Sequence, residues 1–138
     1  MKKRLFGFVA LGLLTATVSV AAQDVNLRAN VPFDFIVNQK VMPKGEYIVK
    51  SAGTLGTQAL SIAAANEDAK SMLISHSCEA KQAADQAKLV FHRYGDSYFL
   101  SQVWTAGDSS GLEVAKSRRE NELAKRSTAN DVSIAALQ

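Results

Sequence analysis

Two β-rich runs joined by a two-residue turn constrain the fold of this chain more than any other feature. The runs are Lys88–Tyr94 and Ser97–Trp104, and Gly95-Asp96 lies between them. A two-residue connection that begins with Gly favours a tight β-hairpin, because Gly readily adopts the positive φ that such turns need. The resulting register pairs Tyr94 with Ser97, Arg93 with Tyr98, His92 with Phe99, Phe91 with Leu100 and Val90 with Ser101.

Alternate residues of this hairpin fall on two faces, and neither face is cleanly polar. The first face carries Leu89, Phe91, Arg93, Tyr98, Leu100, Gln102 and Trp104. The second face carries Val90, His92, Tyr94, Ser97, Phe99, Ser101 and Val103. A sheet with one solvated face alternates apolar and polar residues more strictly. We therefore expect the hairpin to be covered on both sides, or to meet a partner with its second face.

Short strands separated by turn signals run through the rest of the chain. Residues 24–38 alternate with period two, and Pro32, which cannot donate to a ladder, divides that run. Ser117 and Glu120 have the spacing of a capping box, which predicts a short helix over 118–126. Further strands are expected at 46–51, 59–64, 71–77 and 131–137, with turns or loops at 38–45, 52–57, 66–68, 78–87 and 105–111. This pattern predicts a mainly β fold, an antiparallel β-sandwich or small barrel with a short C-terminal helix.

The N-terminal segment has the layout of a secretory signal peptide. Three basic residues at 2–4 precede an uncharged apolar run over 5–20, and Ala21-Ala22 then leads into polar sequence. A membrane-spanning helix needs about 20 apolar residues, so the shorter run favours cleavage after Ala22 over an uncleaved anchor. We expect a signal peptide at 1–22 and a single β-rich domain at 23–138. The domain would be exported, periplasmic or extracellular, with no stable membrane span after cleavage.

The charge balance argues against a nucleic-acid partner. The chain has 16 Lys+Arg against 13 Asp+Glu, and removing the three basic residues at 2–4 leaves 13 of each sign. A nucleic-acid binder uses a basic surplus to neutralise phosphates. We therefore expect the partner to be a protein or another component of the cell envelope.

Cys78 is the only cysteine, so it has no partner for an internal disulfide. Free cysteine is among the most buried residue types, and we expect Cys78 to be buried or partly buried. A lone thiol without a CxxC motif also argues against a redox enzyme. A zinc site built from His76, Cys78 and His92 is not predicted, because their spacing lacks the paired pattern of zinc motifs. No cofactor is expected.

The hairpin also carries the candidate functional residues. A ligand or partner patch is predicted at His92, Arg93, Tyr94, Tyr98 and Trp104. The alternative is structural, with His92 packed beside its cross-strand neighbour Phe99. No catalytic residue is predicted, since the chain lacks a GxSxG motif, and Asp34 and Glu46 resemble ordinary solvated strand carboxylates.

Four segments resemble an uncharacterised family of small secreted bacterial proteins. They are Val31-Pro32-Phe33-Asp34-Phe35, Met42-Pro43-Lys44-Gly45-Glu46-Tyr47, His92-Arg93-Tyr94-Gly95-Asp96 with Tyr98-Phe99-Leu100-Ser101 and Trp104, and residues 117–124. The match covers most of the chain after residue 22, and the hairpin is its most specific part. The resemblance implies export and a single domain, and it transfers no catalytic residues.

Three functions are therefore compared. The leading hypothesis is an exported, non-enzymatic binding or structural module with an unknown partner. The alternative is a small β-barrel that carries an apolar ligand, with Phe91, Leu100 and Trp104 lining its interior. The third is a hydrolase-type enzyme, which requires His92 within hydrogen-bond reach of a Ser or Asp in a cleft.

Overall fold

A computed structural model of the protein describes residues 24–53 and 58–138. Within these residues the chain is mainly β, as predicted, with one short helix. The strands are β1 Asn26–Val31, β2 Phe35–Val37, β3 Lys40–Met42, β4 Gly45–Ser51, β5 Ala59–Ala64, β6 Lys70–Glu79, β7 Lys88–Tyr94, β8 Ser97–Trp104, β9 Ser110–Val114 and β10 Asn130–Ala135, and the helix α1 is Arg118–Ala124. The predicted signal peptide at 1–22 lies outside the described residues.

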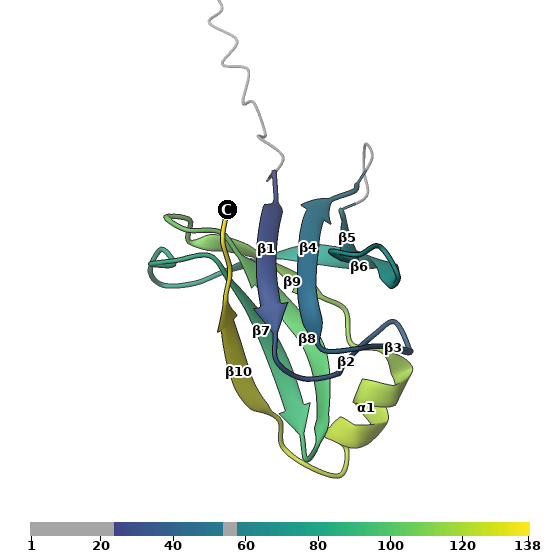
Figure 1. Cartoon of the computed structure of the whole chain (residues 1–138). Helices are drawn as coiled ribbons and strands as arrows, with labels where there is room; N and C mark the ends of the chain where they lie inside the picture. The colour runs from purple at the N-terminus through teal and green to yellow at the C-terminus, as the bar shows by residue number, and fades with distance from the viewer. Residues whose placement is uncertain (1–23, 54–57) are drawn as a thin grey trace, which may run out of the picture.

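The strands form one large, strongly curved sheet with the order β1-β4-β5-β6-β9-β8-β2-β3, and β7 and β10 extend it from the other edge of β8. The described pairings are antiparallel except that β2 runs parallel to β8, so the sheet is mixed. The sheet does not close into a barrel. Its curvature nevertheless brings β1 in front of β7 and β8 (Figure 1), and Arg28 and Leu137 form an isolated bridge there.

Apolar side chains fill the space inside this curve. Period-two alternation works as predicted in β1, where Leu27, Ala29 and Val31 are buried and their neighbours are exposed. The largest fully buried side chains come from strands on both sides of the curve: Phe35, Tyr47, Phe91, Leu27, Met42, Leu60, Ile62, Leu73 and Leu89. Burying one such side chain contributes about 1.5–3 kcal/mol, so this cluster is the main source of stability.

The central hairpin forms with the predicted strand ends, and Gly95 has a φ of 61° in its turn. Four of the five expected pairs are present, but Val90 pairs with Gln102 instead of Ser101. The Val90–Ser101 pairing was therefore wrong, because a β-bulge after Leu100 leaves Ser101 as an extra residue. Beyond the bulge, each residue of β8 lies on the face opposite to the one that the sequence predicted. Val103 joins Leu89 in the core, and Trp104 moves to the opposite face.

Two short strands lie where the sequence predicted loops. In residues 38–45, Asn38 and Gln39 both adopt positive φ (49° and 69°) and make a two-residue hairpin turn, so β3 can pair with β2. The expected loop at 105–111 ends early, and β9 begins at Ser110 between β6 and β8.

The remaining elements follow the expectations closely. β5 matches its predicted range, β6 extends to Glu79, and α1 ends at Ala124 instead of Arg126. The last predicted strand is present as β10, which pairs with β7. The polar turn at 66–68 is also present, with Glu67 at a φ of 63°. The predicted loop at 52–57 falls partly outside the described residues.

Candidate functional site

Helix α1 begins at a capped N-terminus but uses its glutamate in an unexpected way. The Ser117 hydroxyl accepts a hydrogen bond from the Glu120 amide at 3.2 Å, as the capping box predicts. The Glu120 carboxylate, however, turns toward the sheet, where its side chain is 4% exposed. An ionised carboxylate buried this deeply needs hydrogen-bond donors.

His92 and Tyr94 on β7 supply those donors. Glu120 Oε1 lies 2.7 Å from His92 Nδ1, and the Tyr94 hydroxyl donates to the same oxygen at 3.2 Å. On the other side of the imidazole, Ser101 Oγ lies 3.0 Å from His92 Nε2. We refer to Ser101, His92, Glu120 and Tyr94 as the His92 network. Exposed Asp131 on β10 flanks it, with Oδ1 3.6 Å from His92 Nε2.

The bulge in β8 places Ser101 in this network. Ser101 has no Cα partner on β7, and its side chain lies on the same side of the sheet as His92. An ionised carboxylate only accepts hydrogen bonds, so His92 Nδ1 carries the proton shared with Glu120. In the neutral imidazole, Nε2 is then the acceptor and Ser101 is the donor.

This connectivity is that of the Ser–His–carboxylate triad that serine hydrolases use. Such a triad also needs a cleft through which the substrate reaches the serine. Ser101 is 3% exposed, and neither of the two hollows described in this part of the chain is lined by Ser101 or His92. The Ser101 hydroxyl is therefore largely buried in this conformation.

The network instead attaches α1 to the sheet. Leu123 of α1 and Ala129 pack over a small buried cluster of Ile36, Tyr94 and Phe99. Burial raises the pKa of the Tyr94 phenol, and the Glu120 charge raises it further. Tyr94 thus remains a protonated donor, and the polar and apolar contacts together hold the helix.

The five residues of the predicted patch do not lie together. His92 and Tyr94 share the α1 side, and His92 pairs with Phe99 in the predicted register. Arg93 and Tyr98 lie on the other face, with the guanidinium 5.5 Å from the ring centroid. Trp104 lies at the far end of β8 against Gly111. Of the five, His92 and Tyr94 belong to the His92 network, and the other three lie elsewhere.

Cys78 on β6 is partly buried, as expected, and its neighbour across the ladder is Gly111 on β9. Burial raises the pKa of the Cys78 thiol, and the charge of Glu113 adds to this effect. In the described part of the chain, no three His, Cys, Asp or Glu residues are grouped closely enough to hold a metal ion. No described helix is long and apolar enough to cross a membrane.

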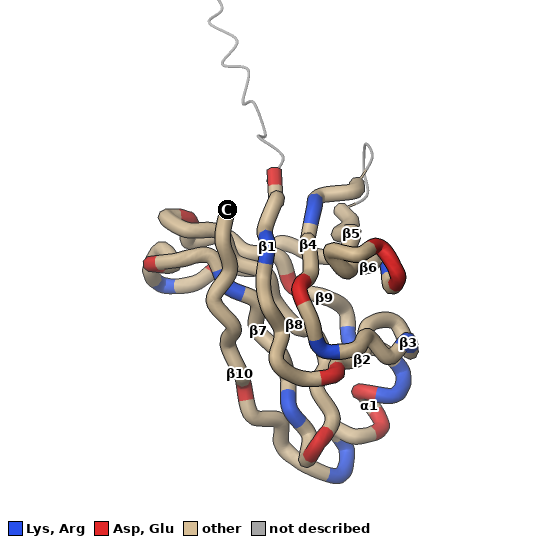
Figure 2. The backbone as a smooth tube through the Cα atoms, in the orientation of Figure 1, with Lys and Arg blue, Asp and Glu red and all other residues tan. Residues whose placement is uncertain are grey.

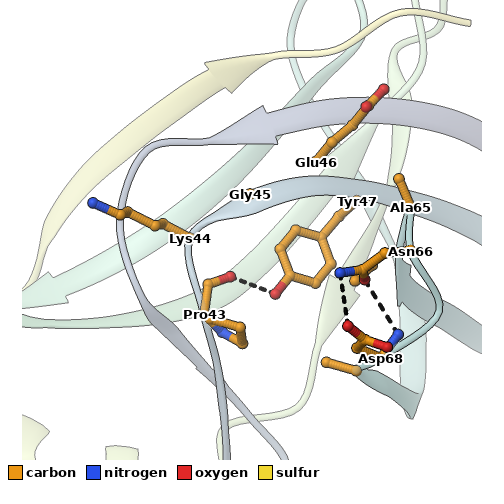
Figure 3. Close-up of a pocket in the computed structure, with 10 residues that line it drawn as sticks. Pro43, Lys44, Gly45, Glu46, Tyr47, Ala65, Asn66 and Asp68 are labelled. Carbon is orange, nitrogen blue, oxygen red and sulfur yellow. Dashed lines mark hydrogen bonds between the residues drawn. The ribbon is translucent and has the colours of Figure 1, made fainter.

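A hollow of about 330 Å³ lies between the start of β4 and the β5–β6 turn (Figure 3). We call it the Tyr47 recess. Some of its polar groups are already bonded within the protein: the Tyr47 hydroxyl donates to the Pro43 carbonyl, and Asn66 bonds to Asp68. Burial raises the pKa of Tyr47, and Asp34 raises it further. These bonds leave fewer polar groups free to meet a ligand in the recess, and Lys44 points away from it.

The surface beside this recess exposes large apolar side chains. Met72 and Ile74 on β6 are 60% and 61% exposed. They lie two residues apart, so they share one face of the strand. Their partners on β5 are the small residues Ser61 and Ala59, which leave both side chains standing above the sheet. Figure 2 shows charges of both signs scattered over the surface, with an acidic turn just before β6.

Comparison of the chain with protein-family models, curated proteins and solved structures gave no match. The function must therefore be inferred from the residues and their arrangement. The exposed face of β6 was not among the sequence candidates. Met72 and Ile74 alternate with Leu73 and Ser75 along this strand. Because both alternating sets contain apolar residues, the sequence did not indicate which set faces the core.

Proposed function

We propose that the protein is an exported, non-enzymatic module that binds a polypeptide partner through the face of β6 that carries Met72 and Ile74. The observation that supports this most strongly is the exposure of these two side chains next to each other. Large apolar side chains that gather on a surface mark interaction sites more often than scattered ones do. Both residues lie on a ten-residue strand at the centre of the sheet order, which gives the surface a rigid support.

The buried state of the His92 network favours binding over hydrolysis. A nucleophile must contact its substrate. Ser101, on the side of the sheet that α1 covers, is only 3% exposed. The network also has a sufficient structural role, because it satisfies Glu120 and fixes α1. A binding module needs only such a rigid scaffold.

The packed interior favours a surface binder over an apolar carrier. Phe91 and Leu100, two of the three proposed lining residues, are packed within the main core cluster. Trp104, the third, lies on the other face as a consequence of the bulge. Two of the three residues expected to surround an apolar ligand therefore pack within the core, and the third is not beside them. Export itself is proposed from the signal-peptide layout of residues 1–22.

Site-specific photocrosslinking tests this function. The chain is expressed in a bacterial host with a benzophenone amino acid in place of Ile74, and the exported fraction is irradiated. We expect one polypeptide to crosslink at position 74, and its purified form to bind the unmodified protein. A benzophenone in place of Glu122, which is 57% exposed on α1, is the matched control and should capture nothing.

Two further measurements make the test decisive. Met72→Ser with Ile74→Ser should reduce binding of the purified partner at least tenfold. Mass spectrometry of the exported protein should show a chain that lacks residues 1–22. Equal binding by the double variant, or retention of the full chain in the cytoplasm, would contradict the proposal.

A further inference from the structure

The first half of β6 has a neighbouring strand on only one of its edges. β5 pairs with Lys70 to Ile74 along one edge of β6. On the opposite edge, β9 pairs only with Ser75 to Glu79. In the described part of the chain, no strand pairs with Lys70 through Ile74 on the β9 side. We call this side of these five residues the open edge. An open edge presents backbone groups that a further strand can pair with.

Two side chains from the β2–β3 hairpin occupy part of the open edge. Asn38 Nδ2 donates to the Met72 carbonyl at 2.6 Å, and Lys40 Nζ donates to the Lys70 carbonyl at 3.1 Å. Both bonds lie at the exposed surface. Figure 1 shows β3 on the same side of the molecule as the start of β6. We call Asn38 and Lys40 the edge-capping side chains.

The positions of the capped carbonyls match the repeat of a β-ladder. Lys70 and Met72 are two residues apart, which is the spacing at which a neighbouring strand meets one edge. Exposed side-chain bonds of this kind contribute little net stability and are readily exchanged. A lysine on an edge is also a common means of preventing unwanted strand pairing. The edge-capping side chains therefore occupy two backbone carbonyls that could instead accept hydrogen bonds from the backbone of a partner strand.

The surroundings of the open edge suit a strand rather than a compact ligand. Met72 and Ile74 are exposed along the open edge. The Tyr47 recess adjoins the start of this edge, because Ala69 lines the recess and the next residue, Lys70, begins β6. Outward side chains of a strand paired along the edge would lie beside the two apolar side chains. A side chain near its end would reach the recess.

We propose that the partner binds as an extended polypeptide segment that pairs with the open edge of β6 and displaces Asn38 and Lys40. This inference rests on the proposed function and names the partner as a strand with apolar residues at alternate positions. Its backbone amides would replace the edge-capping side chains as donors to Lys70 and Met72. Its apolar side chains would pack on Met72 and Ile74. Main-chain bonds then supply the attachment, and alternate side chains supply selectivity.

Charge favours a different chain over a second copy of this protein as the added strand. Antiparallel pairing of two open edges would bring Lys40 and Lys70 from both copies to one small interface. Like charges placed together across an interface are unfavourable. A partner strand without these lysines avoids that repulsion.

A synthetic peptide tests strand addition without knowledge of the natural partner. The probe is a fluorescein-labelled, capped eight-residue peptide of alternating threonine and valine, followed by fluorescence polarisation. The variant is Asn38→Gly with Lys40→Ala, where Gly keeps the positive φ of residue 38. We expect this variant to bind the peptide about tenfold more tightly than the wild type, since two competing hydrogen bonds are removed. Asn121→Ala with Lys125→Ala on α1 is the matched control and should bind like the wild type.

A fully N-methylated copy of the peptide keeps the side chains and lacks the backbone donors, so it should not bind. Equal binding of the methylated peptide, or no gain on removing the edge-capping side chains, would overturn strand addition. Dimerisation of the Asn38/Lys40 variant in sedimentation without peptide binding would also overturn it, and would assign the edge to a second copy. The single variants Asn38→Gly and Lys40→Ala repeat the test if the double variant unfolds.

The two proposals fail in distinguishable ways. A partner captured at position 74 whose affinity is unchanged in the Asn38/Lys40 variant would retain the β6 face as the binding surface and reject strand addition. Peptide binding at the open edge with no partner captured at position 74 would support strand addition and reject the proposed function.

Discussion

Glu120 Oε1 lies 2.7 Å from His92 Nδ1, a contact between α1 and β7 across 28 positions of sequence. The helix has seven residues, and helices of this length are not stable by themselves in water. Its apolar contribution is limited to Leu123, which packs on the Ile36, Tyr94 and Phe99 cluster. The buried polar contact is therefore the main attachment of α1 to the sheet.

Removing this attachment should destabilise the protein strongly. We expect Glu120→Ala to lower the free energy of unfolding by about 2–4 kcal/mol, because His92 and Tyr94 lose a buried charged partner. Urea denaturation followed by circular dichroism measures this change. Glu122→Ala is the control, since Glu122 is exposed on the same helix and should change stability by less than about 0.5 kcal/mol. Similar effects of the two substitutions would show that the contact does not anchor α1.

Gly111 is required by the position of Trp104. A Cβ built on Gly111 would lie 2.6 Å from Trp104 Cε3, well inside van der Waals contact. We expect Gly111→Ala to destabilise the protein by about 1–3 kcal/mol, the usual cost of overpacking, and to shift the emission of this single tryptophan. In a Trp104→Leu background the smaller side chain leaves room for the added methyl group. Gly111→Ala should therefore lower the free energy of unfolding by less in that background. Equal costs in both backgrounds would place the strain somewhere other than the ring.

The sequence predicted the strands well where alternation and turn chemistry agreed. The hairpin ends around Gly95 and the alternation of β1 are examples. It missed β3 because Asn38-Gln39 is not a typical hairpin dipeptide, although both residues adopt the positive φ that the turn demands. The bulge at Ser101 was also not predicted from the sequence. Inserting one residue changes which face every later residue occupies, and alternation alone does not mark the insertion.

The candidate site was predictable only in part. His92 and Tyr94 were singled out, but Glu120 was assigned to the capping box, which its sequence spacing fits equally well. The helix can be capped by Ser117 alone, which leaves the carboxylate available to the sheet. Contacts between β7 and α1 depend on tertiary packing, and local sequence patterns do not report such packing.

Stability should decrease at high pH because two tyrosines are buried. Burial raises the pKa of Tyr94, with Glu120 adding to it, and burial also raises the pKa of Tyr47. Above pH of about 10 the unfolded chain loses these protons while the folded chain retains them, so the free energy of unfolding falls as pH rises. The contribution is complete below the unfolded pKa. It is lost progressively up to the folded pKa.

Tyr94→Phe tests this dependence. The variant loses one hydrogen bond at neutral pH, but its stability should fall less steeply between pH 9.5 and 11 than that of the wild type. Each such group contributes a slope of up to about 1.4 kcal/mol per pH unit. The measurement is urea denaturation at several pH values in this interval. Identical slopes would mean that Tyr94 titrates alike in both states.

The reactivity of Cys78 tests whether burial and the charge of Glu113 act on its thiol. Burial raises the pKa of its thiol, and the charge of Glu113 on β9 raises it further. The thiolate is the reactive form, so at pH 8 we expect Cys78 to react with a disulfide reagent more slowly than a free cysteine does. Glu113→Gln removes one source of repulsion and should increase the rate by less than about tenfold, which corresponds to a pKa change below one unit. Glu122→Gln on α1 is the control and should leave the rate unchanged. A rate unaffected by Glu113→Gln at every pH between 7 and 9 would show that the Glu113 charge does not act on the thiol.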